Sequence, residues 1–203
     1  MLKRSAAVLA VASLAASISA GGSENPSGEA SGFISEAPAA IAAKLTSTND
    51  TTGTFIQTKT TPDGAKYVCR GTYAIHPGRS FEWRISYPFD ALFYADLNNY
   101  VYSNEDECVT KPLDNLPGFS RFRNAESGDF SDFFKVFDVL YKEDPPGVAS
   151  GAQFHVLAKP KEPRIAKFLE RVDADGTSGD WTLKAKFPNG TTFEVRFTDD
   201  PRK

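Results

Sequence analysis

The sequence predicts a mainly β protein, built on one antiparallel sheet of about eight to eleven strands and interrupted by one or two helical segments. Segment after segment alternates apolar and polar side chains with a period of two, which is typical of strands with one buried face. Clusters of Pro, Asp, Asn and Gly separate these segments, as the turns of a meander do. With 203 residues, 40% of them hydrophobic and 24% charged, the chain fits a single globular domain.

The N-terminus has the layout of a secretory signal peptide. Lys3 and Arg4 precede a small apolar run from Ser5 to Ile18, and Ser19-Ala20-Gly21 offers small residues for cleavage. We expect residues 1–20 to be a signal peptide, residues 21–32 a flexible leader and residues 33–203 a single domain. The alternative for the first segment is a buried Ala-rich helix.

Charge and composition narrow the function classes. The formal net charge is −3 and the Lys and Arg residues are scattered, which argues against nucleic acid as a partner. Two His and two Cys leave little material for a metal site, and we expect no metal and no cofactor. His76 and His155 lie in no nucleophile elbow, zinc motif or triad pattern, so an enzyme is not expected.

The sequence contains two cysteines, Cys69 and Cys108. In the oxidising compartment that an exported protein enters, such a pair is most simply a disulfide. The alternative is two free, buried thiols.

Each element follows from its local pattern. Ser35 is a suitable cap for a helix from Glu36 to Leu45. Turn residues Pro62-Asp63-Gly64 join the first two strands into a hairpin. The predicted strands are Thr54–Lys59, Tyr67–Ile75, Phe81–Tyr87, Ala91–Ala95, Tyr100–Tyr102, Gln153–Ala158, Phe168–Val172 (ending in a turn at Asp173–Gly176), Trp181–Phe187 and Phe193–Phe197.

A second helix is predicted from Phe130 to Tyr141, with Asp129 as its cap. Its aromatic residues Phe133, Phe134 and Phe137 recur at helical spacing, which gives a short amphipathic helix with an aromatic face.

The third strand has one apolar side, formed by Phe81, Trp83, Ile85 and Tyr87. An apolar face of a curved sheet must be covered, either by a filled core or around a cavity that holds a small apolar ligand. Judged from the sequence pattern alone, a filled core is more common than a ligand cavity.

Several motifs, in this order along the chain, resemble the periplasmic outer-membrane lipoprotein carrier family, which is LolA-like. They are Thr54-Phe55-Ile56-Gln57, Gly71, His76-Pro77-Gly78-Arg79-Ser80-Phe81-Glu82-Trp83, Tyr87-Pro88, Asp96-Leu97-Asn98-Asn99-Tyr100-Val101-Tyr102, Phe154-His155-Val156-Leu157-Ala158-Lys159-Pro160-Lys161 and Asp173-Ala174-Asp175-Gly176.

The resemblance implies an incomplete antiparallel barrel with short helices as a lid over a hydrophobic cavity. Residues assigned to the cavity or to lipid binding are Phe81, Trp83, Ile85, Tyr87, Phe93, Phe133, Phe134 and Phe137. The family holds its lid with an Arg just before the Pro of the third strand. Here His76 takes that position and Arg79 lies three residues on, so either is a candidate latch.

The implied function is that of a periplasmic carrier or chaperone rather than a catalyst. Such a carrier takes the acyl chains of a lipoprotein or another acylated lipid from an inner-membrane transporter and passes them to an outer-membrane receptor. We expect it to act as a monomer. The alternative is a periplasmic lipid-binding or sensor domain on the same scaffold, with a cargo other than a lipoprotein.

Overall fold

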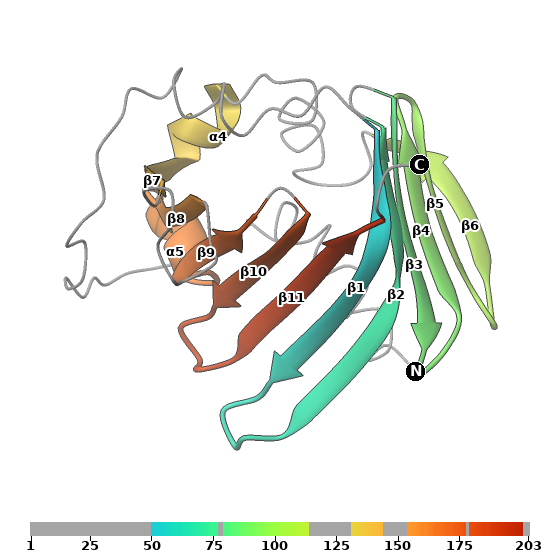
Figure 1. Cartoon of the computed structure of the whole chain (residues 1–203), viewed down its shortest axis with the longest axis horizontal. Helices are drawn as coiled ribbons and strands as arrows, with labels where there is room; N and C mark the ends of the chain where they lie inside the picture. The colour runs from blue at the N-terminus through green and yellow to red at the C-terminus, as the bar shows by residue number, and fades with distance from the viewer. Residues whose placement is uncertain (1–49, 77–78, 114–130, 144–153, 178, 201–203) are drawn as a thin grey trace.

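The computed structural model describes residues 50–76, 79–113, 131–143, 154–177 and 179–200 (Figure 1). The expected signal peptide, the leader, the helix from Glu36 to Leu45 with its Ser35 cap, and Asp129 all lie outside these residues.

The predicted mainly β class is confirmed. One antiparallel sheet of 11 strands dominates the described residues, and two short helices accompany it. The elements are β1 (Thr51–Thr60), β2 (Lys66–His76), β3 (Ser80–Tyr87), β4 (Ala91–Asp96), β5 (Asn99–Asn104), β6 (Cys108–Pro112), α4 (Ser131–Val136), β7 (Phe137–Glu143), β8 (Phe154–Pro160), α5 (Pro163–Ala166), β9 (Arg171–Gly176), β10 (Asp180–Lys186) and β11 (Thr192–Asp199).

The strand order is β6-β5-β4-β3-β2-β1-β11-β10-β9-β8-β7. The sheet therefore consists of two meanders that meet where the first strand, β1, pairs with the last, β11. Strands β6 and β7 form its two edges, so the sheet is not closed into a barrel.

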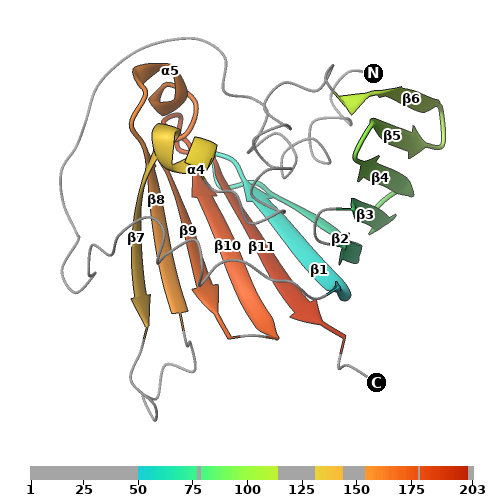
Figure 2. The ribbon, with the colours of Figure 1, turned by 90° about the horizontal axis from the view of Figure 1, so that it is seen from above.

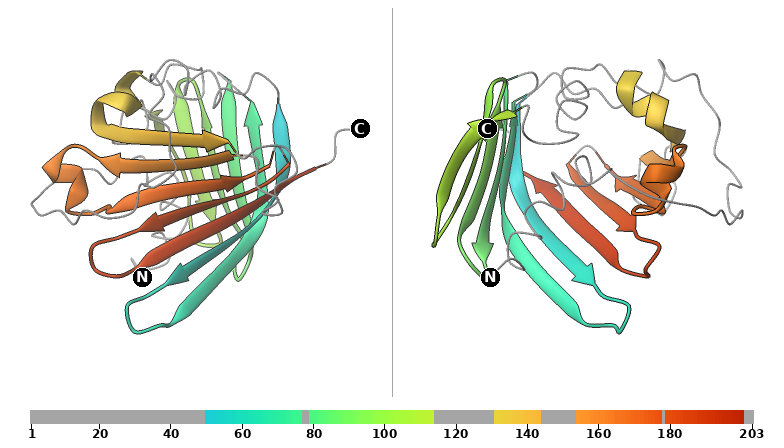
Figure 3. Two further views of the ribbon diagram at one scale, coloured as in Figure 1. Left: turned by 60° about the vertical axis from the view of Figure 1, so that its left-hand side comes forward. Right: turned by 180° about the vertical axis from the view of Figure 1, so that it is seen from behind.

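The sheet bends strongly around the β1–β11 pair, with β2–β6 as one wing and β7–β10 as the other (Figure 2). Views from two further sides show the wings facing each other across the concave side (Figure 3). Helices α4 and α5 lie at one end of the wing that contains β7–β9 (Figure 1). Within the described residues, neither helix has the length and apolar character needed to cross a membrane.

Burial alternates along the strands, and the buried face is the concave one. A first cluster of buried residues centres on Trp83 and draws on β1, β2, β3, β4 and β11. A second cluster joins Val136, Phe137 and Ile165 to Ala158 of β8 and Ala185 of β10. The predicted division into an apolar and a wet face therefore holds through most of the sheet.

Two predicted elements are wrong, and the strand expected at Phe168–Val172 begins only at Arg171, beyond helix α5. The helix expected up to Tyr141 ends at Val136, and Phe137–Glu143 forms strand β7, which pairs along its whole length with β8. The turn expected at Asp173–Gly176 is strand β9 instead, and the chain turns after Gly176, where the Thr177 amide donates to the Asp180 carbonyl at 2.8 Å. Both aspartates of β9 are accommodated in the strand by polar partners: Arg171 Nε lies 3.0 Å from Asp173 Oδ2, and His155 Nδ1 lies 2.7 Å from Asp175 Oδ1.

Candidate functional site

The concave face carries a continuous layer of aromatic rings. The Trp83 ring stacks on Phe55, with centroids 3.7 Å apart, and meets Phe197 edge to face at 5.8 Å. Phe81 lies 6.2 Å from Trp83 on one side, while Trp181 stacks on Phe197 at 3.8 Å on the other. These rings come from β3, β1, β11 and β10, so the layer runs across the junction of the two wings.

Four of the predicted residues belong to this face. Phe81, Trp83, Ile85 and Phe93 are all buried, and all belong to the first core cluster. Sequence reasoning missed the contributions of Phe55 and Phe197 to the same layer. The period-two pattern places each on the apolar side of its own strand, but the pairing of β1 with β11 that brings them together is not visible in the sequence.

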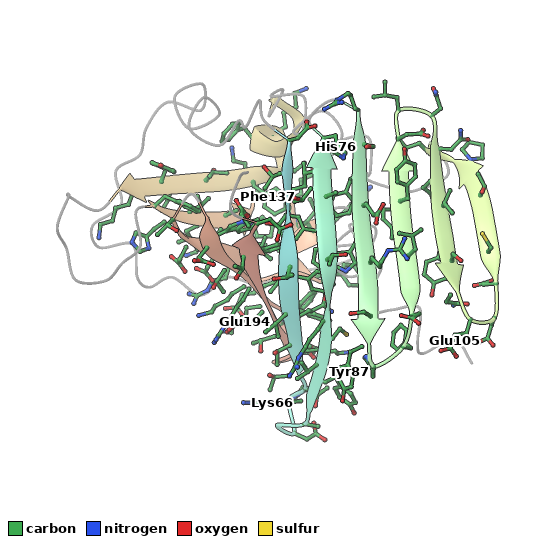
Figure 4. All side chains as sticks on the ribbon, turned by 45° about the vertical axis from the view of Figure 1, so that its right-hand side comes forward. Lys66, His76, Tyr87, Glu105, Phe137 and Glu194 are labelled. Atoms are coloured by element: carbon green, nitrogen blue, oxygen red, sulfur yellow. The ribbon has the colours of Figure 1, made fainter. Side chains whose placement is uncertain are left out.

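The placement of Tyr87 with these residues is wrong, because its side chain is 57% exposed (Figure 4). The register between β2 and β3 shifts: Gly71 faces Ile85, but Arg70 faces Tyr87, which leaves one extra residue in β3. Such a bulge reverses the alternation beyond it. Tyr87 therefore lies on the outer face, where the Arg70 guanidinium carbon is 5.8 Å from its ring centroid. The glycine inside the second predicted strand was the available signal for a bulge.

The three aromatic residues assigned to the lid do not share one helix face. Phe137, labelled in Figure 4, begins β7 and is buried in the second cluster. Phe134 of α4 is half-buried, and its carbonyl accepts a hydrogen bond from Lys161 Nζ at 2.9 Å. The structure does not describe the side chain of Phe133.

Polar side chains also lie on the concave face. Gln57 of β1 is 1% exposed, two residues from Phe55. The Tyr73 hydroxyl donates to the Asp199 carboxylate across the β1–β11 junction. Burial, followed by this hydrogen bond, raises the pKa of Tyr73 above its usual value.

Both candidate latch residues contact the same carboxylate, that of Asp50, the residue directly before β1. His76 Nδ1 lies 2.9 Å from Asp50 Oδ2, and the Arg79 guanidinium is ion-paired with Oδ1. The Arg79 amide also donates to the His76 carbonyl at 2.8 Å, which holds the two together at the β2–β3 turn. Arg79 first, and then His76, lowers the pKa of Asp50. A role of this cluster in holding a lid stays a prediction.

The predicted disulfide is wrong, because both cysteines are free. Cys69 is buried on β2, whereas Cys108 is exposed at the start of β6, and β3, β4 and β5 lie between these strands. At about 4.8 Å per strand the two backbones lie about 19 Å apart along the sheet, and a disulfide needs Cα atoms within about 7 Å.

The second histidine, His155, lies on β8 opposite Asp175 of β9, on the face away from the aromatic layer. Its side chain is 22% exposed. Across the ranges that the structure describes, no three His, Cys, Asp or Glu side chains gather closely enough to hold a metal ion.

No family model matches the chain, and no curated protein matches it. A comparison with solved structures does find similar proteins. Similar solved structures include a LolA superfamily protein from Nitrosomonas europaea, with TM-score 0.41, 9% identity and coverage of 80% of this chain and 90% of that one. Another is a putative outer membrane lipoprotein-sorting protein domain from Vibrio parahaemolyticus, with TM-score 0.42, 9% identity and coverage of 79% and 88%. A DUF1329 family protein from Desulfovibrio piger has TM-score 0.32 and 8% identity, with coverage of 79% and 88%.

The first two structures are named for the same kind of protein that the sequence motifs resemble. At these identities and TM-scores the likeness carries no argument about function. The candidate site therefore rests on the aromatic face itself.

Proposed function

We propose that the protein is a periplasmic carrier that holds the acyl chains of a lipoprotein, or of a related lipid, against the concave aromatic face. The observation that carries the proposal is the ring layer from Phe81 to Trp181, which spans both wings of an open, curved sheet. An acyl chain in water costs about 0.8 kcal/mol for each exposed CH₂ group, so ferrying needs an apolar surface that is shielded from water. Aromatic rings offer a large contact area without demanding hydrogen bonds.

The direction of transport and the partners form the finer part of the proposal. The cargo is received from an inner-membrane transporter and delivered to an outer-membrane receptor, and the carrier acts as a monomer, without a cofactor and without catalysing a reaction. The N-terminal signal-peptide layout and the resemblance of the sequence motifs support this part.

Helix α4 is the proposed lid, with Phe134 as its contact to the cargo. Phe134→Asp should weaken the binding of an acyl probe, because it places a charge where the chain is shielded from water. Phe168→Asp is the matched control, since Phe168 is 41% exposed and a charge there stays in water. Equal probe binding by the two variants would remove α4 from the site.

Native mass spectrometry of the protein recovered from the periplasm tests the proposal directly, because a carrier retains lipid. An environment-sensitive acyl probe gives a second test in a Trp181→Phe background, where Trp83 is the remaining tryptophan. Binding should quench or shift its fluorescence.

A filled core would behave differently. The probe would not bind, and Trp83→Ala would cost about 3–5 kcal/mol of unfolding free energy, as for a packed aromatic residue. A residue on a cavity wall has fewer contacts to lose, so a carrier should lose less. No probe binding together with the large loss would defeat the carrier proposal.

A further inference from the structure

The indole N–H of Trp83 is buried without a hydrogen-bond acceptor among the residues that the structure describes. Trp83 is 2% exposed, so water does not supply an acceptor either. The rings of Phe55, Phe81 and Phe197 surround it. An unsatisfied buried donor costs about 1–3 kcal/mol, and buried polar groups in proteins nearly always have partners.

Two tyrosine hydroxyls on the same face do have partners. Tyr73 donates to Asp199, and the Tyr102 oxygen accepts a hydrogen bond from Asn104 Nδ2 at 2.9 Å. A phenylalanine at position 83 would supply a flat ring without the burial cost of an N–H group. A tryptophan there points to an acceptor that belongs to a bound molecule.

We propose that the Trp83 indole donates a hydrogen bond to the carbonyl oxygen of an ester or amide at the head of a bound acyl chain. The inference rests on the proposed function and adds the ligand class: acyl esters and acyl amides, in preference to plain hydrocarbons and to free fatty acids.

The chemistry of the surroundings sets this preference. A hydrocarbon leaves the indole donor unsatisfied, so it gains only from apolar contact. A fatty-acid carboxylate can accept the hydrogen bond, but its charge would be buried among three aromatic rings that offer no cation. An ester or amide carbonyl accepts the hydrogen bond and brings no charge.

Proton NMR of the indole group in ¹⁵N-labelled protein tests the inference. In the Trp181→Phe background a single indole signal remains, that of Trp83. The probes are methyl decanoate, decane and decanoate, which share one chain length. Methyl decanoate should move the indole proton downfield and bind most tightly, whereas decane should leave the proton in place.

Trp83→Phe supplies the affinity comparison. It should weaken the binding of methyl decanoate about fivefold to tenfold more than the binding of decane, because both probes lose the same ring contact and only the ester also loses one neutral hydrogen bond. The NMR measurement retains Trp83, so the test stands even if this variant fails to fold.

The outcomes separate the two proposals. Binding of all three probes with equal affinity and an unmoved indole proton would overturn the inference and leave the carrier standing. The Phe197 ring could already shift the indole proton of Trp83 upfield, and this shift could persist with the ester bound. That result would show that the ring accepts the hydrogen bond, and it would also overturn the inference. Failure of every probe to bind would overturn the proposed function itself.

Discussion

The rings of Phe55 and Trp83 stack with centroids 3.7 Å apart, although β2 runs between their strands. Gly71 of β2 makes this possible, because it faces Phe55 in the ladder and has no side chain to occupy the space between the rings. A Cβ atom at Gly71 would lie 2.9 Å from Phe55 Cε1 and 1.8 Å from the Arg84 carbonyl oxygen.

Gly71→Ala should therefore destabilise the fold, by about 1–3 kcal/mol as expected for overpacking of a dense core. Urea unfolding followed by tryptophan fluorescence measures the loss. Gly179→Ala is the control, because a Cβ there meets nothing within 4 Å. Equal midpoints for the two variants would contradict the close packing at Gly71.

Tyr73 should make the fold sensitive to alkaline pH. Its pKa is raised from 10.0 in the folded protein by burial and by Asp199. A raised pKa means that its contribution to stability is complete below pH 10 and declines as the pH rises, because the unfolded chain loses the phenol proton first. Unfolding free energies measured at pH 9 and above pH 10 should show this decline.

Tyr73→Phe should cost about 1 kcal/mol at neutral pH through the lost hydrogen bond, and it should flatten the alkaline decline. Tyr67→Phe, at an exposed site, keeps Tyr73 and should keep the decline. An unchanged slope in Tyr73→Phe would assign the effect to other groups.

The two thiols should react at very different rates. Cys108 is exposed, whereas Cys69 is buried and its pKa is raised by that burial, so little reactive thiolate forms. A maleimide reagent should label one thiol of the native protein and the second only after unfolding. Cys108→Ser should remove the fast label, and a native protein that resists labelling at both positions would contradict free cysteines.

The Asp50 carboxylate should titrate below its usual pKa of 3.8, chiefly because of Arg79. NMR titration of Asp50 should show a larger rise in its pKa in Arg79→Gln than in His76→Gln. Because the folded pKa is lowered, the pairing stabilises the fold above about pH 4 and is lost as the pH falls. Arg84→Gln, which removes a pairing with Glu82, should leave Asp50 unchanged; a rise of equal size there would refute the assignment.

Period-two alternation and turn residues predicted most of the strands, and they predicted Phe81, Trp83 and Ile85 as one apolar side. They failed at Tyr87, because the face of a residue beyond a bulge depends on the register with its neighbour, here Gly71 against Ile85. The residue pattern of one strand does not reveal its register with the neighbouring strand.

Two other errors have different causes. Phe137 and Tyr141 fit both a helical and a strand spacing, and the ladder with β8 decides for the strand. Asp173 and Asp175 favour turns by local propensity, but partners far along the chain hold them in β9. The Asp50 cluster was equally hidden, since Asp50 meets His76 and Arg79 only through the β1–β2 ladder, in which Thr51 faces Ile75.

The pairing of the first strand with the last also governs how the molecule folds. Within each wing every ladder joins strands that follow one another in sequence, so each wing can form by short-range closure. The β1–β11 ladder instead closes the longest loop of the described chain. The conformational entropy of closing this loop is lost before the hydrogen bonds of the ladder form. The two wings are thus expected to act as separate folding units, with the assembly of their junction as the slow, rate-setting event.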